Sequence, residues 1–127
     1  MGHVGLLPQF SINFKLKGKS FIQKKKILED AKAVSNSGVF AIVVECVVED
    51  LAKKITEKVP VPTIGIGASK YCDGQILVVD DILGFSDFPP KFVKQYSNLK
   101  SVIEKCVKNY AQDVKLRRFP SSKNVYK

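Results

Sequence analysis

One carboxylate stands out because of where it lies in the sequence. Glu45 directly follows five apolar residues, 40–44, at the expected C-terminal edge of a buried strand. A carboxylate in that place is partly removed from water, which suits it to accept a proton as a general base. A glutamate that ends a strand can also simply reach solvent or a backbone donor. Position alone weighs the two interpretations evenly, so Glu45 is a candidate catalytic base.

His3 is the only histidine of the chain, and it lies between two glycines near its start. An imidazole there could hydrogen-bond a carbonyl or carboxylate group of a substrate. The alternative is an exposed loop histidine, and position alone favours that alternative. His3 is therefore a candidate substrate-binding residue that needs support from elsewhere.

Three aspartates, Asp73, Asp80 and Asp81, carry oxygen atoms that could bind a metal ion. Their spacing matches no EF-hand or other strong template, and roles in turns and helix caps explain them better. The sequence therefore assigns no metal ligand.

The chain has three cysteines, Cys46, Cys72 and Cys106. The number is odd and no C-x-x-C pair occurs, so the pattern indicates neither a disulfide framework nor a zinc site. Cys46 follows an apolar strand and Cys106 falls on the apolar face of a helix. We expect both to be small buried side chains rather than nucleophiles.

The elements that would position these residues alternate between helix and strand. Ser20 is placed to cap a helix, and Gly38 is placed to end it. The run 40–44 is apolar throughout, as a strand buried on both faces requires. Alternating helices and buried strands predict an α/β fold with a parallel sheet, whose function gathers at the C-terminal ends of the strands. The expected segments are a short strand end followed by a loop within residues 2–9, helices at 20–36 and from 49, a strand at 63–67, and a third apolar run at 76–79.

The last long element, residues 98–114, has apolar side chains at positions i, i+3, i+4, i+7, i+8, i+11 and i+15. This spacing predicts an amphipathic helix. Its apolar stripe must be covered by the rest of the fold or by another subunit.

The 127 residues suit one domain, and the formal net charge of +9 favours anionic partners. No run approaches the roughly 20 apolar residues of a membrane span, and no signal peptide is evident. We expect a cytoplasmic protein. A small basic module that binds nucleic acid or a protein partner is the alternative, although no aromatics are interleaved with its basic residues in a strand.

Four sequence blocks occur in a fixed order. They are GHVGL with PQ at residues 2–9, VVECV at 43–47, IGIGA with CDGQILV at 64–78, and LG, PKFVK and a tyrosine at 83–96. In order and spacing they resemble the ketopantoate hydroxymethyltransferase (3-methyl-2-oxobutanoate hydroxymethyltransferase) family from residue 2 to about residue 110.

The resemblance implies a (β/α)8 TIM barrel, of which residues 1–115 would form the C-terminal half, strands five to eight and a C-terminal amphipathic helix. Residues 116–127 would be a basic, flexible tail. It also implies hydroxymethyl transfer from 5,10-methylenetetrahydrofolate to 3-methyl-2-oxobutanoate, giving 2-dehydropantoate for pantothenate synthesis. Mg2+ would bind the oxo acid. Glu45 matches the family's proposed base, and His3 matches a histidine of the substrate site.

The chain departs from the family in three places. The connector after residues 11–13 is shorter than usual and lacks the family's usual glycine pair, and Ser69 stands where glycine is common. A TIM barrel needs about 250 residues, so the Mg2+ ligands are expected on a missing N-terminal half. The chain is then one part of a split or truncated gene product, a subunit that dimerises to close a barrel, or a piece of a longer protein. We expect a homo-oligomer or a complementary N-terminal half as partner, and little activity in the chain alone.

Overall fold

A computed structural model describes residues 1–11 and 15–126, so the start of the short connector after residues 11–13 lies outside the described residues. The chain divides into two compact units, residues 1–77 and residues 78–127. The first unit contains a sheet, two α-helices and a short 3-10 helix, η1 (Pro8–Phe10), and the second contains the other two described α-helices.

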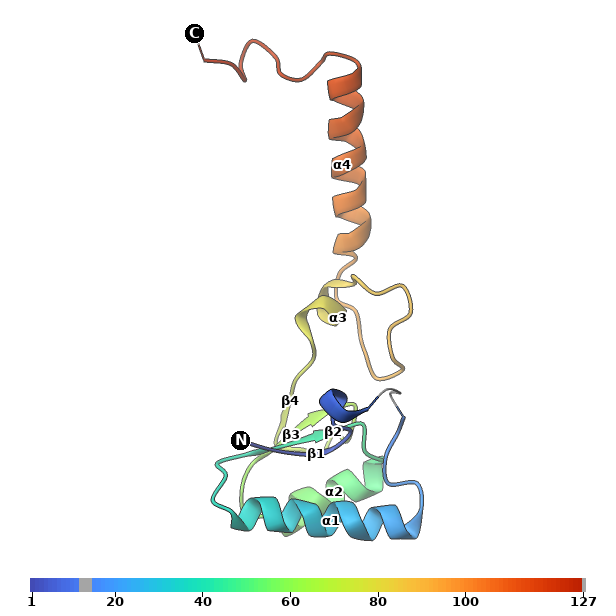
Figure 1. The fold of residues 1–127 in the computed structure, drawn as a ribbon, viewed down its shortest axis with the longest axis vertical. Helices are drawn as coiled ribbons and strands as arrows, with labels where there is room; N and C mark the ends of the chain where they lie inside the picture. Colours follow the sequence, from blue (N-terminus) through green and yellow to red (C-terminus); the bar gives the residue numbers. More distant parts are fainter. Residues whose placement is uncertain (12–14, 127) are drawn as a thin grey trace. The chain divides into compact units, whose positions relative to one another are not determined.

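The sheet of the first unit has four strands in the order β1-β2-β3-β4, and every neighbouring pair is parallel. This arrangement confirms the predicted α/β fold with four parallel strands alternating with helices. Figure 1 shows the strands side by side. They are β1 (Gly2–Gly5), β2 (Ile42–Glu45), β3 (Thr63–Ile66) and β4 (Gly74–Gln75).

Helix α1 (Phe21–Asn36) begins and ends where the sequence predicts. The Ser20 hydroxyl accepts a hydrogen bond from the backbone N–H of Gln23, which satisfies one of the free donors of the first turn. Just past the helix, Gly38 has a φ of +85°, the left-handed conformation that commonly stops a helix. Both capping predictions are confirmed.

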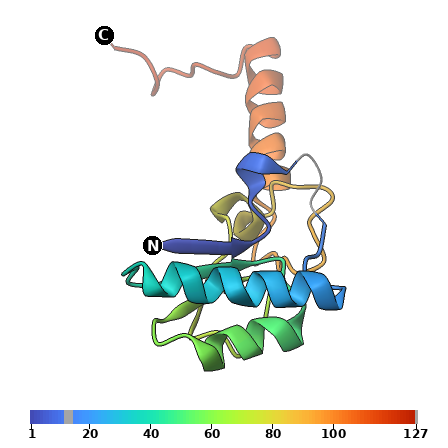
Figure 2. The same cartoon turned by 60° about the horizontal axis from the view of Figure 1, so that its bottom comes forward.

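Helix α2 (Glu49–Lys58) opens with two acidic residues, which complement the positive end of the helix dipole. Helices α1 and α2 lie on the same face of the sheet (Figures 1 and 2). The core lies between these helices and the strands, and its fully buried aliphatic side chains each contribute about 1.5–3 kcal/mol. The buried core residues are Val4, Ala31, Ile42, Val44, Val47, Leu51, Ala52, Ile55, Val59 and Cys72.

Side chains of β1 and β2 alternate between two faces. Val4, Ile42 and Val44 enter the core with the helices, so the odd-numbered neighbours point to the opposite face. The fold therefore separates a helix-packed face from a face that carries His3, Val43 and Glu45.

The third apolar run, residues 76–79, does not itself form a strand. β4 ends at Gln75, and the last ladder hydrogen bond runs from the N–H of Ile76 to the carbonyl of Gly65. The chain then leaves the sheet, and helix α3 (Val79–Leu83) follows. Val78 and Val79 are exposed because they lie beyond the point where β3 offers a partner.

Helix α4 (Leu99–Lys115) of the second unit confirms the predicted amphipathic helix, with Asn98 capping its first turn. The expectation that Cys106 is buried is wrong, because its thiol-bearing side chain is exposed. No described residue of α4 is buried, so its apolar stripe is not covered within its own unit. None of the described helices combines the length and apolar character that crossing a membrane requires.

Asp73 joins β3 to the turn before β4. One carboxylate oxygen accepts hydrogen bonds from the backbone N–H of Thr63 at 2.8 Å and from its hydroxyl at 2.9 Å. Thr63 is fully buried, so these donors have little access to water. Both bonds favour the charged carboxylate and so lower the pKa of Asp73. The bond from the backbone N–H has the larger effect.

Replacing Asp73 with alanine is expected to lower the free energy of unfolding by about 1 kcal/mol, since Asp73 is exposed and solvent screens its charge. The lowered folded-state pKa means that the stabilisation is complete above the unfolded pKa of about 3.9 and is lost as pH falls through the folded value. Urea unfolding at pH 7 and pH 3 checks this. The variant should lose less stability than the wild type on acidification, and an equal loss would contradict the assignment. Asp73→Asn, which keeps an uncharged acceptor, is the control.

Candidate active site at the strand ends

His3 and Glu45 meet on the face of the sheet opposite the helices. Parallel pairing places Gly5 beside Glu45 and His3 beside Val43, so the imidazole lies diagonally across from the carboxylate. His3 Nε2 is 3.1 Å from Glu45 Oε2. The structure therefore brings together the two residues that the sequence singles out.

The His3–Glu45 pair is shielded from water, but the protein does not satisfy all of its hydrogen-bonding groups. The side chain of Glu45 is 11% exposed and that of His3 is 28% exposed. The ring N–H does not point along the line to the carboxylate, so the buried Nε2 has no aligned hydrogen-bond partner among the described residues. A buried polar atom without a partner is costly, and a ligand oxygen could satisfy it.

The backbone at the end of β1 passes unusually close to Glu45. Gly5 has a φ of +95°, and a Cβ on it would lie 2.2 Å from the carbonyl oxygen of Glu45. That same oxygen accepts a hydrogen bond from the N–H of Leu6 at 2.8 Å. Glycine is required here, because a side chain would push apart the two strands that carry His3 and Glu45.

Cys46 follows Glu45 with a φ of +48°, a backbone conformation that costs a residue other than glycine about 1–2 kcal/mol. Its side chain is buried, as predicted from the sequence. Burial, and secondarily the negative charge of Glu45, raise the pKa of the Cys46 thiol. The thiol therefore stays protonated near neutral pH, and this argues against a role as nucleophile.

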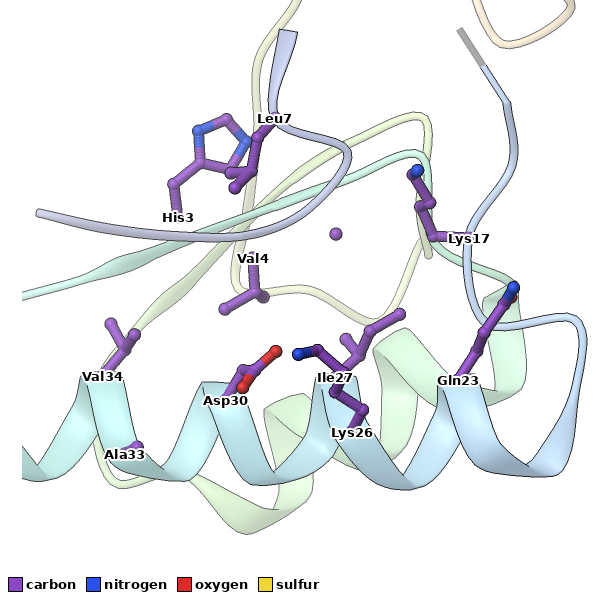
Figure 3. Close-up of a pocket in the computed structure, with 11 residues that line it drawn as sticks. His3, Val4, Leu7, Lys17, Gln23, Lys26, Ile27, Asp30, Ala33 and Val34 are labelled. Carbon is purple, nitrogen blue, oxygen red and sulfur yellow. The ribbon is translucent and has the colours of Figure 1, made fainter. Parts of the chain in front are cut away.

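A pocket of about 570 Å³ lies beside His3, between β1 and α1. Its apolar side is formed by Val4, Ile27 and Val34, and Lys17 and Asp30 are among its polar lining residues. Figure 3 shows His3 and Val4 on opposite sides of β1. No pattern in the sequence predicts this pocket, because its lining depends on which face of α1 lies along β1.

The aspartates considered as metal ligands have other roles. Asp73 accepts the hydrogen bonds from Thr63. Asp80 and Asp81 lie in the first turn of α3, where their negative charges interact favourably with the positive end of the helix dipole. Within residues 1–11 and 15–126, no three His, Cys, Asp or Glu side chains lie together in a way that could hold a metal ion.

Ser69, which departs from the expected glycine, has a local function in the turn after β3. Its hydroxyl accepts a hydrogen bond from the N–H of Tyr71 at 3.2 Å, and its carbonyl accepts one from the side chain of Gln75 at 2.7 Å. These bonds hold the turn together without the backbone freedom of glycine.

Comparison with known proteins agrees with this architecture. The sequence profile of the family described as ketopantoate hydroxymethyltransferase matches residues 1–122. This chain belongs to the ketopantoate hydroxymethyltransferase family. Its four parallel strands alternating with helices have the arrangement of half of the family's (β/α)8 barrel.

Curated members of the ketopantoate hydroxymethyltransferase family are closely similar to the chain. The 3-methyl-2-oxobutanoate hydroxymethyltransferase of Phenylobacterium zucineum is 54% identical over 99% of this chain and 47% of its own length. That of Pelagibacter ubique is 50% identical over 99% and 49%, and that of Clostridium botulinum is 51% identical over 100% and 48%. The chain thus spans about half the length of these relatives, namely their C-terminal half.

The close approach at Gly5 can be tested against a second glycine. Gly5→Ala is expected to lower the free energy of unfolding by about 3 kcal/mol, because it combines backbone strain with a clash. Gly38→Ala is the matched control, since Gly38 also has a positive φ but a Cβ there meets nothing within 4 Å. It should cost about 1 kcal/mol. Urea unfolding followed by circular dichroism measures both, and equal losses would contradict the proposed clash.

Proposed function

We propose that this chain supplies one half of the active site of a 3-methyl-2-oxobutanoate hydroxymethyltransferase. The overall reaction would move a hydroxymethyl group from 5,10-methylenetetrahydrofolate to 3-methyl-2-oxobutanoate and give 2-dehydropantoate. The single observation that carries the proposal is the His3–Glu45 pair at the strand ends of a chain that belongs to this family.

Glu45 would act as the general base of the reaction. Its carboxylate is shielded from water, which favours transfer of a proton from carbon over exchange with solvent. Glu45 would take the proton at C3 of the oxo acid, and the electrons of that C–H bond would form the enolate. The enolate carbon is the nucleophile that accepts the one-carbon unit.

His3 would bind the oxo acid beside the base. Its buried Nε2 lacks an aligned partner, so it can donate a hydrogen bond to a carbonyl or carboxylate oxygen of the substrate. Because Nε2 is 3.1 Å from Glu45, that substrate oxygen would lie next to the carboxylate. The ring would thus hold the substrate beside the base.

The family resemblance also implies Mg2+, which would stabilise the negative charge of the enolate oxygen. The described residues do not form such a site, because no group of three potential ligands comes together among them. The metal ligands would therefore lie in the half of the relatives that the chain does not span.

The open edge of β1 would receive that other half. Among the described strands β1 pairs only with β2, so its second edge is free to accept a further parallel strand. The adjoining pocket of about 570 Å³ would accept side chains of the same partner. The homo-oligomer and the cytoplasmic location remain predictions from the sequence. The nucleic-acid alternative is not favoured, because the family match covers residues 1–122.

Complementation tests the division of the site between two halves. The chain alone is expected to exchange the C3 proton of 3-methyl-2-oxobutanoate with D2O no faster than buffer, as followed by proton NMR. Mixing it with the N-terminal half of a curated relative and Mg2+ should restore exchange. Exchange by the chain alone would contradict the assignment of essential groups to the other half.

In the complemented protein, Glu45→Gln is expected to slow C3 proton exchange by at least about 100-fold, because glutamine cannot accept the proton. Glu49→Gln is the control, since Glu49 is an exposed acid in the first turn of α2. It should leave the exchange rate unchanged. Undiminished exchange in Glu45→Gln would exclude Glu45 as the base.

A further inference from the structure

Left-handed backbone recurs at the ends of the three adjacent strands β1, β2 and β3. Gly5 ends β1 with a φ of +95°, and Gly67 follows β3 with a φ of +61°. Cys46 follows β2 with a φ of +48°. Glycine adopts this conformation freely, whereas other residues adopt it rarely. Of these three positions, the one that carries a side chain comes directly after Glu45.

Hydrogen bonds hold the Cys46 turn on both sides. The N–H of Cys46 donates to the carbonyl of Ile66 at 2.9 Å, and its own carbonyl accepts from the N–H of Lys17 at 2.7 Å. The carbonyl of Lys17 then accepts from the N–H of Val48 at 3.1 Å. The chain before α1 therefore crosses over the end of β2 and fixes the turn in place.

Hydrogen bonds on both sides hold the peptide group that joins Glu45 to Cys46. Its carbonyl accepts from the N–H of Leu6, and its N–H donates to the carbonyl of Ile66. Glu45 itself is paired with Gly5 on one side and with Ile66 on the other. With its backbone held on both sides, Glu45 retains only the torsions of its side chain. Its carboxylate then lies 3.1 Å from the ring of His3.

We infer that Cys46 is a positioning residue: its left-handed turn, held by the backbone of Lys17, aims the Glu45 carboxylate at His3. The inference rests on the proposed function only in that Glu45 is the group to be positioned. The contribution comes from the backbone conformation of Cys46, whose thiol is buried. The rival explanation is that Cys46 acts only through the packing of its sulfur.

The two explanations differ in which substitutions matter. Glycine removes the sulfur but accepts a φ of +48° without strain, so the backbone account predicts that Cys46→Gly keeps the pair in place. Valine fills the space but is branched at Cβ and resists the left-handed conformation. The backbone account therefore predicts that Cys46→Val displaces Glu45 from His3.

The single histidine makes this measurable in the chain without any assay of activity. Because His3 is the only histidine, a long-range 1H–15N spectrum contains one set of imidazole signals. Glu45→Gln defines how far the Nε2 signal moves when the carboxylate is lost. Cys46→Val should move it in the same direction by a comparable amount, and Cys46→Gly should leave it at the wild-type position.

Arg117→Val is the matched control, because Arg117 is the other described residue besides glycine with a positive φ, at +54°, and belongs to the second unit. It should leave the His3 signal unmoved. An unmoved signal in folded Cys46→Val, or a displaced signal in Cys46→Gly, would overturn the inference; if Cys46→Val fails to fold, Cys46→Gly decides. Neither result depends on proton exchange from the oxo acid, so failure of the proposed function would be recognised separately.

Discussion

The parallel pairing of β1 with β2 is the interaction on which the candidate site depends. Its register puts the imidazole and the carboxylate on one face of the sheet and the aliphatic side chains on the other. A slip of one residue would send every side chain of a strand to the opposite face. Packing against α1 and α2 opposes such a slip, because it would expose Val4 or Val44 and bury polar groups instead. The hydrophobic core thus sets the geometry of the polar pair.

Local sequence signals predicted those parts of the fold that depend on local physics. The sequence alone predicts the serine cap at Ser20, the end of the helix at Gly38 and the buried strand before Glu45. Capping, left-handed turns and continuous apolar runs each depend on only a few neighbouring residues. Helix α4 is predicted from the spacing of its apolar residues for the same reason. The exposure of Cys106 could not be predicted in this way. An apolar stripe indicates that one face of a helix packs against a partner, but it does not show whether that partner is present.

The same distinction between local and long-range features applies to the candidate site. Glu45 could be selected from its position at a strand end, and His3 only through resemblance to a family. Their distance required the strand register, and the need for glycine at position 5 required the path of the neighbouring carbonyl. The pocket beside β1 and the crossing of Lys17 over the end of β2 likewise depend on segments brought together by folding.

The uncovered stripe of α4 has a consequence for how the chain behaves in solution. Exposed valine, isoleucine and tyrosine side chains on that helix would attract one another between molecules, whereas a net charge of +9 makes the molecules repel. Salt shortens the reach of that repulsion from about 10 Å at 0.1 M to about 3 Å at 1 M but leaves apolar attraction intact. The colloidal stability of the chain should therefore be set by ionic strength, and dilute buffers are the conditions that favour dispersed molecules.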